Sequence, residues 1–263
     1  DKATVILMVG GWPRDDMGQV LRRAHQAAAS DLLESLLGQR QYVGQVVLAT
    51  DDAGWAATLS DFPVAIELDQ GDEPFVFGHR LAALIERYGA RRVLYSGGGS
   101  APLMVAERWG EILDRLATAD EIVLTNNVHS CDWVGFTHAQ DVVNVVGREA
   151  QDNALAWVLS HEVGLPVEDC EPEAATRFDL DTPMDLLIAR RHPGVSAHLR
   201  SALDRLDWAC QQLDDVISIL GREGTSLAIA GRVSSAAWDA IDRATQCWIR
   251  VFAEERGMLA SGR

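Results

Sequence analysis

The chain has 263 residues and carries 39 Asp and Glu against 23 Lys and Arg, a formal net charge of −16. So acidic a surface repels phosphate backbones and anionic lipid headgroups, and we therefore expect neither a nucleic-acid partner nor a membrane partner. Apolar residues make up 48% of the chain, enough for a sizeable core. The early apolar run Val5–Val9 is too short for a signal sequence or a membrane span, and the four cysteines form no CxxC pair, so we expect a cytoplasmic protein.

The charge is uneven along the chain, and its distribution suggests two domains. Residues 195–263 carry 8 basic and 9 acidic groups, whereas residues 1–194 carry 15 basic and 30 acidic groups. The change follows a stretch, His192-Pro193-Gly194, that is typical of a helix end. We predict an α/β domain over 1–194 and a helical appendage over 195–263.

The first 194 residues alternate between short apolar runs and longer amphipathic segments. This alternation predicts a Rossmann-like, three-layer fold with a mostly parallel sheet and helices on both faces. Ligands bind such sheets at the carboxyl ends of the strands. The expected strands are 4–9, 46–50, 64–68, 92–96 and 121–125, and the expected helices are 17–37, 78–90 and 103–118.

Glycines follow two of the expected strands, and both groups are candidates for nucleotide binding. Gly10 and Gly11 come after the first strand, and Gly98, Gly99 and Ser100 come after the strand 92–96. Glycines at such places let the backbone approach a phosphate beside a helix start. A tight strand-to-helix turn explains the first group equally well, while three consecutive glycines at 97–99 exceed what a turn needs.

Polar side chains after other strands complete the candidate site. Arg80, in the first turn of a helix, opposes the helix dipole, so either an anionic ligand or the neighbouring Glu73 is its expected partner. Asn127 and Asp132 lie in a polar loop after the strand 121–125. Asp179 and Asp181 lie in an extended segment, and we expect only one of them to face the site. One or two such carboxylates are enough for Mg²⁺, although capping of the next helix by Asp181 or Thr182 is the simpler explanation.

Taken in order, these segments resemble the nucleotidyltransferase superfamily with the GT-A, or nucleotide-diphospho-sugar transferase, fold, over about residues 3–192. The patterns closest to it are those of the molybdenum-cofactor and 2-phospho-L-lactate guanylyltransferases and of related glycosyltransferases. The resemblance rests on Val5–Gly11, on Gln70-Gly71 with Gly78-x-Arg80-Leu81, on Gly98-Gly99-Ser100-Ala101-Pro102-Leu103, and on Asp179-x-Asp181-Thr182-Pro183-x-Asp185-Leu186. The last motif is the most specific.

The resemblance implies a Mg²⁺-dependent transfer from a nucleoside triphosphate or sugar nucleotide to a small phosphorylated or hydroxyl acceptor. Asp179 and Asp181 would hold the metal, Asp181, Arg14 and Arg80 would act in catalysis, and the glycines, Ser100, Asn127 and Asp132 would bind the nucleotide. The chain departs from the family where Ser100 replaces the metal-binding Asp of the middle motif and where the downstream Lys of the first loop is missing. The alternative is a catalytically silent nucleotide-binding module whose tail binds a partner.

The last 69 residues show a heptad-like apolar seam. Leu203, Leu206, Cys210, Leu213, Ile217 and Leu220 follow steps of three and four, and Trp238, Ile241, Thr245, Trp248 and Phe252 repeat them. This spacing predicts a helical hairpin. Because an isolated hairpin of this size buries little surface, we expect a homodimer through these C-terminal helices.

Overall fold

A computed structural model describes residues 1–69 and 74–253 of the chain. The chain divides into two compact units, the first ending at Leu206 and the second beginning at Asp207. Among the described helices, none has both the length and the apolar character needed to cross a bilayer.

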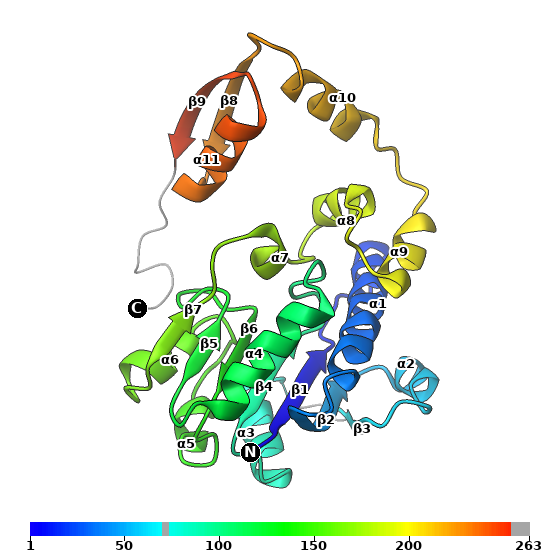
Figure 1. Cartoon of the computed structure of the whole chain (residues 1–263). Coiled ribbons are helices and arrows are strands. Elements are labelled where there is room, and N and C mark those ends of the chain that lie inside the picture. The colour runs from blue at the N-terminus through cyan, green and yellow to red at the C-terminus, as the bar shows by residue number, and fades with distance from the viewer. Residues whose placement is uncertain (70–73, 254–263) are drawn as a thin grey trace. The chain divides into compact units, whose positions relative to one another are not determined.

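The first unit is built on a seven-stranded sheet (Figure 1). The strand order is β3-β2-β1-β4-β6-β5-β7, and only β6 runs antiparallel to its neighbours. The strands are β1 (Ala3–Val9), β2 (Val43–Thr50), β3 (Ala65–Leu68), β4 (Val93–Gly97), β5 (Val123–Thr125), β6 (Trp133–Phe136) and β7 (Val167–Asp169). The predicted, mostly parallel sheet is confirmed, and its first five expected strands correspond to β1–β5.

Helices cover both faces of the sheet and produce three layers (Figure 1). The helices of this unit are α1 (Asp16–Leu37), α2 (Ala53–Thr58), α3 (Phe77–Arg87), α4 (Ala106–Thr118), α5 (Val143–Val146), α6 (Leu155–His161), α7 (Ala174–Arg177), α8 (Pro183–Arg191) and α9 (Ala197–Asp204). Alternate residues of β1 explain the layering: Leu7 joins the core with α1 and α4, and Ile6 joins the core with α3, α5 and α6. Because both faces of β1 are buried, its sequence is a nearly continuous apolar run.

The strand order places a crevice at the carboxyl end of β1. From β1 the chain moves to β2 and β3 on one side, and then returns to add β4 on the other side of β1. The loops after β1 and β4 consequently diverge, which is where open α/β sheets bind ligands.

Helix α9 belongs to the first unit, so the division falls later than the position expected after residue 194. Asp31 of α1 accepts hydrogen bonds from the backbone N–H groups of His198 and Leu199, each at 2.9 Å. Leu199 and Leu203 are buried against this unit. Capping of the α9 N-terminus by Asp31 and burial of its apolar face explain why the Pro-Gly sequence before α9 does not mark the boundary.

The second unit is not the helical hairpin that the heptad-like seam predicted. It contains α10 (Gln211–Leu220), β8 (Ser226–Gly231), α11 (Ser235–Ala244) and β9 (Trp248–Ala253), with β8 and β9 paired in parallel. The segment 248–252, Trp-Ile-Arg-Val-Phe, alternates with period two and is rich in β-branched and aromatic residues, so its strand preference overrides the helical spacing.

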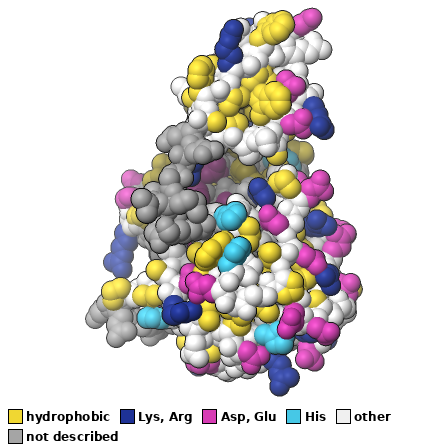
Figure 2. Space-filling model, turned by 90° about the vertical axis from the view of Figure 1, so that its left-hand side faces the viewer, with side chains coloured by type: hydrophobic (Ala, Val, Ile, Leu, Met, Phe, Trp, Pro, Cys, Tyr) yellow, Lys and Arg dark blue, Asp and Glu magenta, His cyan; other side chains and the backbone are white. Residues whose placement is uncertain are grey.

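The second unit leaves much of its apolar surface exposed. None of its described residues, 207–253, is buried, and Trp248 and Phe252 are 72% and 64% exposed. Hydrophobic side chains gather on the surface of this unit in Figure 2. Parallel sheets are normally covered on both faces, and a two-stranded one is marginal by itself.

Replacing Leu33 by Ala tests the core of the first unit. Leu33 of α1 is fully buried in the cluster with β1 and α4, so the change should lower the free energy of unfolding by about 2–5 kcal/mol. Urea titration followed by circular dichroism measures this loss. The control Met184→Ala, at a position 52% exposed, should change it by about 0.5 kcal/mol or less. Equal losses in the two variants would contradict the assigned core.

Candidate functional site

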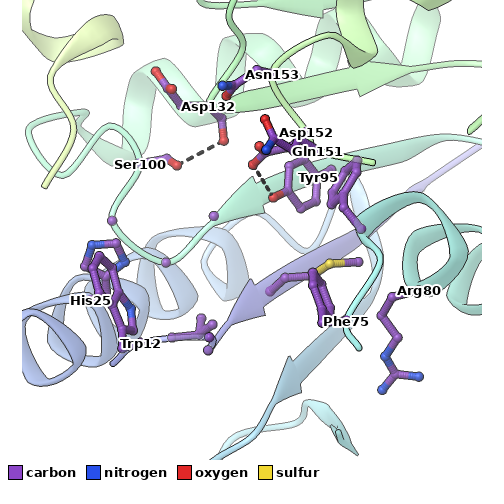
Figure 3. A pocket seen from close by; sticks show the side chains of 18 of the residues that line it. Trp12, His25, Phe75, Arg80, Tyr95, Ser100, Asp132, Gln151, Asp152 and Asn153 are labelled. Carbon is purple, nitrogen blue, oxygen red and sulfur yellow. Dashed lines mark hydrogen bonds between the residues drawn. The ribbon is translucent and has the colours of Figure 1, made fainter. Parts of the chain in front are cut away.

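A cavity of about 1130 Å³ lies at the carboxyl ends of β1, β2 and β4 (Figure 3). Glycines and aromatic side chains form part of its wall and carboxylates form much of the rest. The lining comprises Met8, Val9, Gly10, Gly11, Trp12, His25, Asp51, Leu68, Asp69, Phe75, Phe77, Arg80, Tyr95, Gly97, Gly98, Gly99, Ser100, Ser130, Asp132, Ala150, Gln151, Asp152, Asn153, Asp179 and Asp181.

The loop after β1 approaches the end of β2 closely. Gly11 has a φ of +79°, a conformation that favours glycine, and its N–H donates to Oδ2 of Asp51 at 3.3 Å. A Cβ on Gly10 would lie 2.9 Å from Oδ1 of the same Asp51. The backbone conformation therefore favours glycine at Gly11, a Cβ at Gly10 would displace the Asp51 carboxylate, and both glycines line the cavity.

The loop after β4 is packed just as closely against α1 and β1. A Cβ on Gly98 would lie 2.9 Å from both methyl groups of Val9, and one on Gly99 would lie 2.6 Å from Nε2 of His25. Gly98 and Gly99 thus allow close packing and also line the cavity with their backbone.

His25 connects three segments that line the cavity. Its Nε2 lies 2.8 Å from the carbonyl oxygen of Leu180, and its ring meets Trp12 edge-on with centroids 4.4 Å apart. Because the carbonyl can only accept, Nε2 carries the proton of the neutral ring. Burial lowers the pKa of His25, which keeps the ring neutral near pH 7. The side chain holds the segment 179–181 next to Gly99 and the loop after β1.

Four carboxylates converge on one side of the cavity. Asp132 precedes β6, Asp152 precedes α6, and Asp179 and Asp181 precede α8. Burial, with the neighbouring carboxylates, raises the pKa of Asp179 to about 7 and that of Asp132 to about 6. Burial also raises the pKa of Asp152. Such a group favours protons or cations, because ionised carboxylates repel one another at close range.

Both Asp179 and Asp181 line the cavity, so the expectation that only one would face the site is wrong. Residues i and i+2 of an extended segment point to the same side, and Leu180 between them is fully buried. Thr182 caps α8 in a capping box with Asp185, which frees Asp181 from that structural role.

Ser100 also faces the acidic side of the cavity, where the family pattern has an aspartate. Its hydroxyl donates to the backbone carbonyl oxygen of Asp132 at 2.9 Å (Figure 3). Its backbone forms an isolated bridge with Asp179. Ser100 therefore ties the loop after β4 to two of the four acidic residues.

The predicted basic residues occupy different places. Arg80 lines the cavity and is paired with two acids, its Nε lying 2.7 Å from Asp69 and its Nη2 lying 3.6 Å from Glu67. Arg14 is exposed, and neither it nor Asn127 is among the described residues that line the cavity. The predicted alternative partner Glu73, like the motif residues Gln70 and Gly71, falls outside the described residues.

Sequence reasoning missed the wall that runs from Tyr95 to the loop before α6. The Tyr95 hydroxyl donates to Oδ2 of Asp152 at 2.8 Å, and Gln151 and Asn153 flank that aspartate (Figure 3). Tyr95 sits within an apolar strand and the sequence 151–153 follows no expected strand. Only the polar Gln-Asp-Asn triplet ahead of an apolar helix was available as a signal.

A second cluster of possible metal ligands lies apart from the cavity lining. Asp31, Glu34 and His198 come together where α9 packs on α1. Asp31 already caps α9, and His198 lies 2.9 Å from Glu34. These contacts account for the cluster as part of the packing of α9.

Replacing Gly99 by Ala tests its packing against His25. The added methyl group should displace the imidazole and lower the unfolding free energy by about 1–3 kcal/mol. A second Gly99→Ala chain that also carries His25→Ala should lose less than the sum of the two single changes, as measured by a double-mutant cycle in urea. The control Gly221→Ala has no neighbour closer than 3.6 Å. If the losses of unfolding free energy from His25→Ala and Gly99→Ala simply add, the contact between the two residues is contradicted.

Comparison with known proteins identifies the fold. No family model and no curated protein matches the sequence. Three solved structures align with most of this chain: a protein described as a nucleotide-diphospho-sugar transferase from Desulfovibrio desulfuricans (16% identity, 78% of this chain and 98% of that one, TM-score 0.50), a cytidylyltransferase from Leptospira borgpetersenii (12%, 82% and 97%, 0.52) and a nucleotidyl transferase from Methanothermobacter thermautotrophicus (13%, 76% and 99%, 0.55). At these identities the likeness concerns the fold. The first unit has the α/β fold of these nucleotidyl and nucleotide-sugar transferases, as the motif resemblance predicted.

Proposed function

We propose that the chain is a nucleotidyltransferase that binds a nucleoside triphosphate, or a related sugar nucleotide, in the cavity of the first unit and transfers part of it to a small acceptor. The observation that carries this proposal is the arrangement of the cavity. Two close-packed glycine loops and a group of four carboxylates line the same cavity at the carboxyl ends of the strands. The solved structures of similar fold support the same chemical class.

The charge of the cavity argues for a divalent cation. Among the described lining residues there are six aspartates and one arginine, and that arginine is already paired with Asp69 and Glu67. A triphosphate would be repelled unless a cation offset these charges. Asp179, Asp181 and Asp132 offer the hard oxygen ligands that Mg²⁺ prefers. Burial and neighbouring carboxylates raise the pKa of Asp179 and of Asp132, so a cation would offset their repulsion. When bound, Mg²⁺ would neutralise charge on the transferred phosphate.

The remaining lining residues would bind and orient the donor. Gly10 and Gly11 on one side, with Gly98 and Gly99 on the other, offer backbone that a nucleotide can approach closely. Arg80 would assist with negative charge on the donor, and the exposed Arg14, near the end of the loop after β1, would be a second source of positive charge. Ser100 would act indirectly, by holding Asp132 and Asp179 in place.

A silent nucleotide-binding module is the second candidate, because Ser100 stands where the family pattern has a carboxylate. A neutral hydroxyl is a weaker Mg²⁺ ligand, and in this chain it donates to a backbone carbonyl. The geometry favours the active enzyme, because Asp132, Asp179 and Asp181 supply carboxylates from other loops.

A thermal-shift series tests the proposal. GTP, CTP, ATP and UDP-sugars are each added with and without Mg²⁺, and at least one should raise the melting temperature only when the metal is present. At a hundredfold excess over Kd, binding should add about 2.7 kcal/mol to the unfolding free energy. Asp181→Ala should abolish the metal-dependent shift, while the control Asp114→Ala, on the exposed face of α4, should keep it. Metal-independent shifts would favour the silent module, and no shift with any nucleotide would overturn both candidates.

Metal binding and stability should depend on pH in opposite directions. The raised pKa values of Asp179, about 7, and Asp132, about 6, stabilise the metal-free fold at acid pH, and that contribution is lost as pH rises through 6 and 7. Because Mg²⁺ requires the ionised carboxylates, its affinity should rise over the same window, by up to about tenfold per pH unit for each proton released. Calorimetry between pH 5.5 and 8 measures both trends. A Mg²⁺ affinity that does not change with pH would contradict these assignments. Asp179→Asn should make the affinity less dependent on pH.

The expected homodimer stays a prediction, but the C-terminal helices no longer provide its interface. We propose that the β8–β9 sheet of one chain packs against the same sheet of a second copy. Trp248, Phe252, Ala228 and Ala230 share one face with Ser226 and Arg250, and among the described residues no third strand pairs with β8 or β9. Residues 195–263 carry 8 basic and 9 acidic groups, so little net charge opposes pairing. Light scattering should give twice the chain mass of 28.7 kDa, and Trp248→Glu with Phe252→Glu should give the monomer. A wild-type monomer at 100 μM would contradict the prediction.

A further inference from the structure

One wall of the cavity is left unassigned by the proposed donor site. We call it the acceptor wall, and it consists of Tyr95, Ser130, Gln151, Asp152 and Asn153. In Figure 3 Asp152 and its neighbours lie on the same side of the cavity as Asp132 and across it from Arg80. Hydroxyl, amide and carboxylate groups make up this wall, so it offers hydrogen-bond partners to a polar molecule beside the carboxylates that fit the metal.

The acceptor wall has no basic side chain among the described lining residues. Arg80 lies on the far side and is engaged with Asp69 and Glu67. Arg177 is close enough to lower the pKa of Asp132, but its Nε donates to the carbonyl oxygen of Asn126, its Nη2 lies 3.6 Å from Asp169, and it does not line the cavity.

The surroundings of this wall are acidic. Asp132, Asp179 and Asp181 lie close enough to Asp152 for electrostatic repulsion, and burial lowers the pKa of His25, a lining residue of α1, so that its ring is neutral near pH 7. A divalent cation held there is already needed to offset these carboxylates and the donor phosphates. A phosphorylated acceptor would bring two further negative charges to a wall without a cation, whereas a neutral or cationic acceptor would not.

Asp152 is held in a geometry that suits a proton acceptor. Its Oδ2 accepts from the Tyr95 hydroxyl at 2.8 Å, and its carboxylate also receives its own backbone N–H and that of Asn153. Burial outweighs these hydrogen bonds and raises its pKa, which makes the ionised form a stronger base. Tyr95, fully buried, fixes the carboxylate and is a positioning residue.

We propose that the acceptor is a hydroxyl compound without a phosphate group, such as a polyol, a sugar or an amino alcohol, and that it binds on the acceptor wall with its reacting hydroxyl at Asp152. This inference rests on the proposed function. The acceptor oxygen forms a bond to the α-phosphorus of the nucleoside triphosphate, the bond from that phosphorus to pyrophosphate breaks, and the hydroxyl proton goes to Asp152. A phosphorylated acceptor would not need that base.

Two matched acceptor sets test this choice in the full-length chain with Mg²⁺ and the nucleotide that binds. One set is glycerol, glucose and ethanolamine, and the other is glycerol 3-phosphate, glucose 1-phosphate and phosphoethanolamine. Pyrophosphate release and product mass should show at least tenfold faster transfer to the first set. Faster or equal transfer to the second set, or reaction with neither, would overturn the inference while metal-dependent nucleotide binding leaves the donor site standing. Failure of nucleotide binding itself would overturn the proposed function first.

Two substitutions test the wall itself. Asp152→Asn should slow transfer by about a hundredfold or more while leaving the nucleotide thermal shift unchanged, and the matched control Asp114→Asn should alter neither. Asn153→Arg adds the missing cation, and glycerol 3-phosphate should inhibit this variant at a concentration at least tenfold lower than it inhibits the wild type. Full transfer by Asp152→Asn, or unchanged inhibition of Asn153→Arg, would contradict the assignment.

Discussion

The repulsion among Asp132, Asp152, Asp179 and Asp181 is the constraint on which the rest of the site depends. The four carboxylates come from three separate loops, and burial makes ionisation costly at Asp132, Asp152 and Asp179. Hydrogen bonds from Ser100 to the Asp132 backbone and from Tyr95 to Asp152 hold two of these loops in place despite that cost. A site so arranged gains most from a small, hard cation, and this property connects the fold with phosphate chemistry more directly than any single motif does.

The negative charge of the whole chain and the negative charge of the cavity have to be considered separately. The overall value of −16 disfavours large polyanions, whereas the ligand that we propose for the cavity is a small anion that binds together with a metal. Arg80 is the only arginine among the described lining residues, and it is paired with Asp69 and Glu67. These two carboxylates offset its positive charge. Acidity at the surface and acidity in the cavity therefore have different consequences.

Much of the first unit could be predicted from its sequence, because β1, β2 and β4 are continuous apolar runs that end in glycine or aspartate. Gly10 and Gly98 were identified in this way, Asp132 from the polar loop after the strand 121–125 and Asp179 from its extended segment, and all four line the cavity. Period two also places Asp179 and Asp181 on one face, a relation that was misjudged. Asp152 and His25 could not be found, since each acts through partners distant in sequence, Tyr95 and Leu180.

The second unit shows why spacing alone misleads. The steps of three and four that connect Trp238 to Phe252 fit a helix, but the local alternation at 248–252 also fits a strand, and backbone pairing with β8 determines the outcome. The seam from Leu203 to Leu220 is likewise not one helix, because α9 ends at Asp204 and α10 begins at Gln211. Helix α9 packs on the first unit, where Asp31 caps its N-terminus. Such long-range contacts leave no periodic trace in the sequence.

The contact of His25 with Leu180 has a consequence for the order in which the protein is made. His25 lies in the first helix of the chain, whereas the carbonyl that it contacts lies 155 positions later, just before α8. Contacts of such separation close only after the intervening chain is available. During synthesis both glycine loops emerge before the segment 179–181, so the nascent chain presents only part of the cavity lining until that segment follows. The segment 179–181 lies late in the first unit, so the lining of the cavity is complete only after most of that unit has been synthesised.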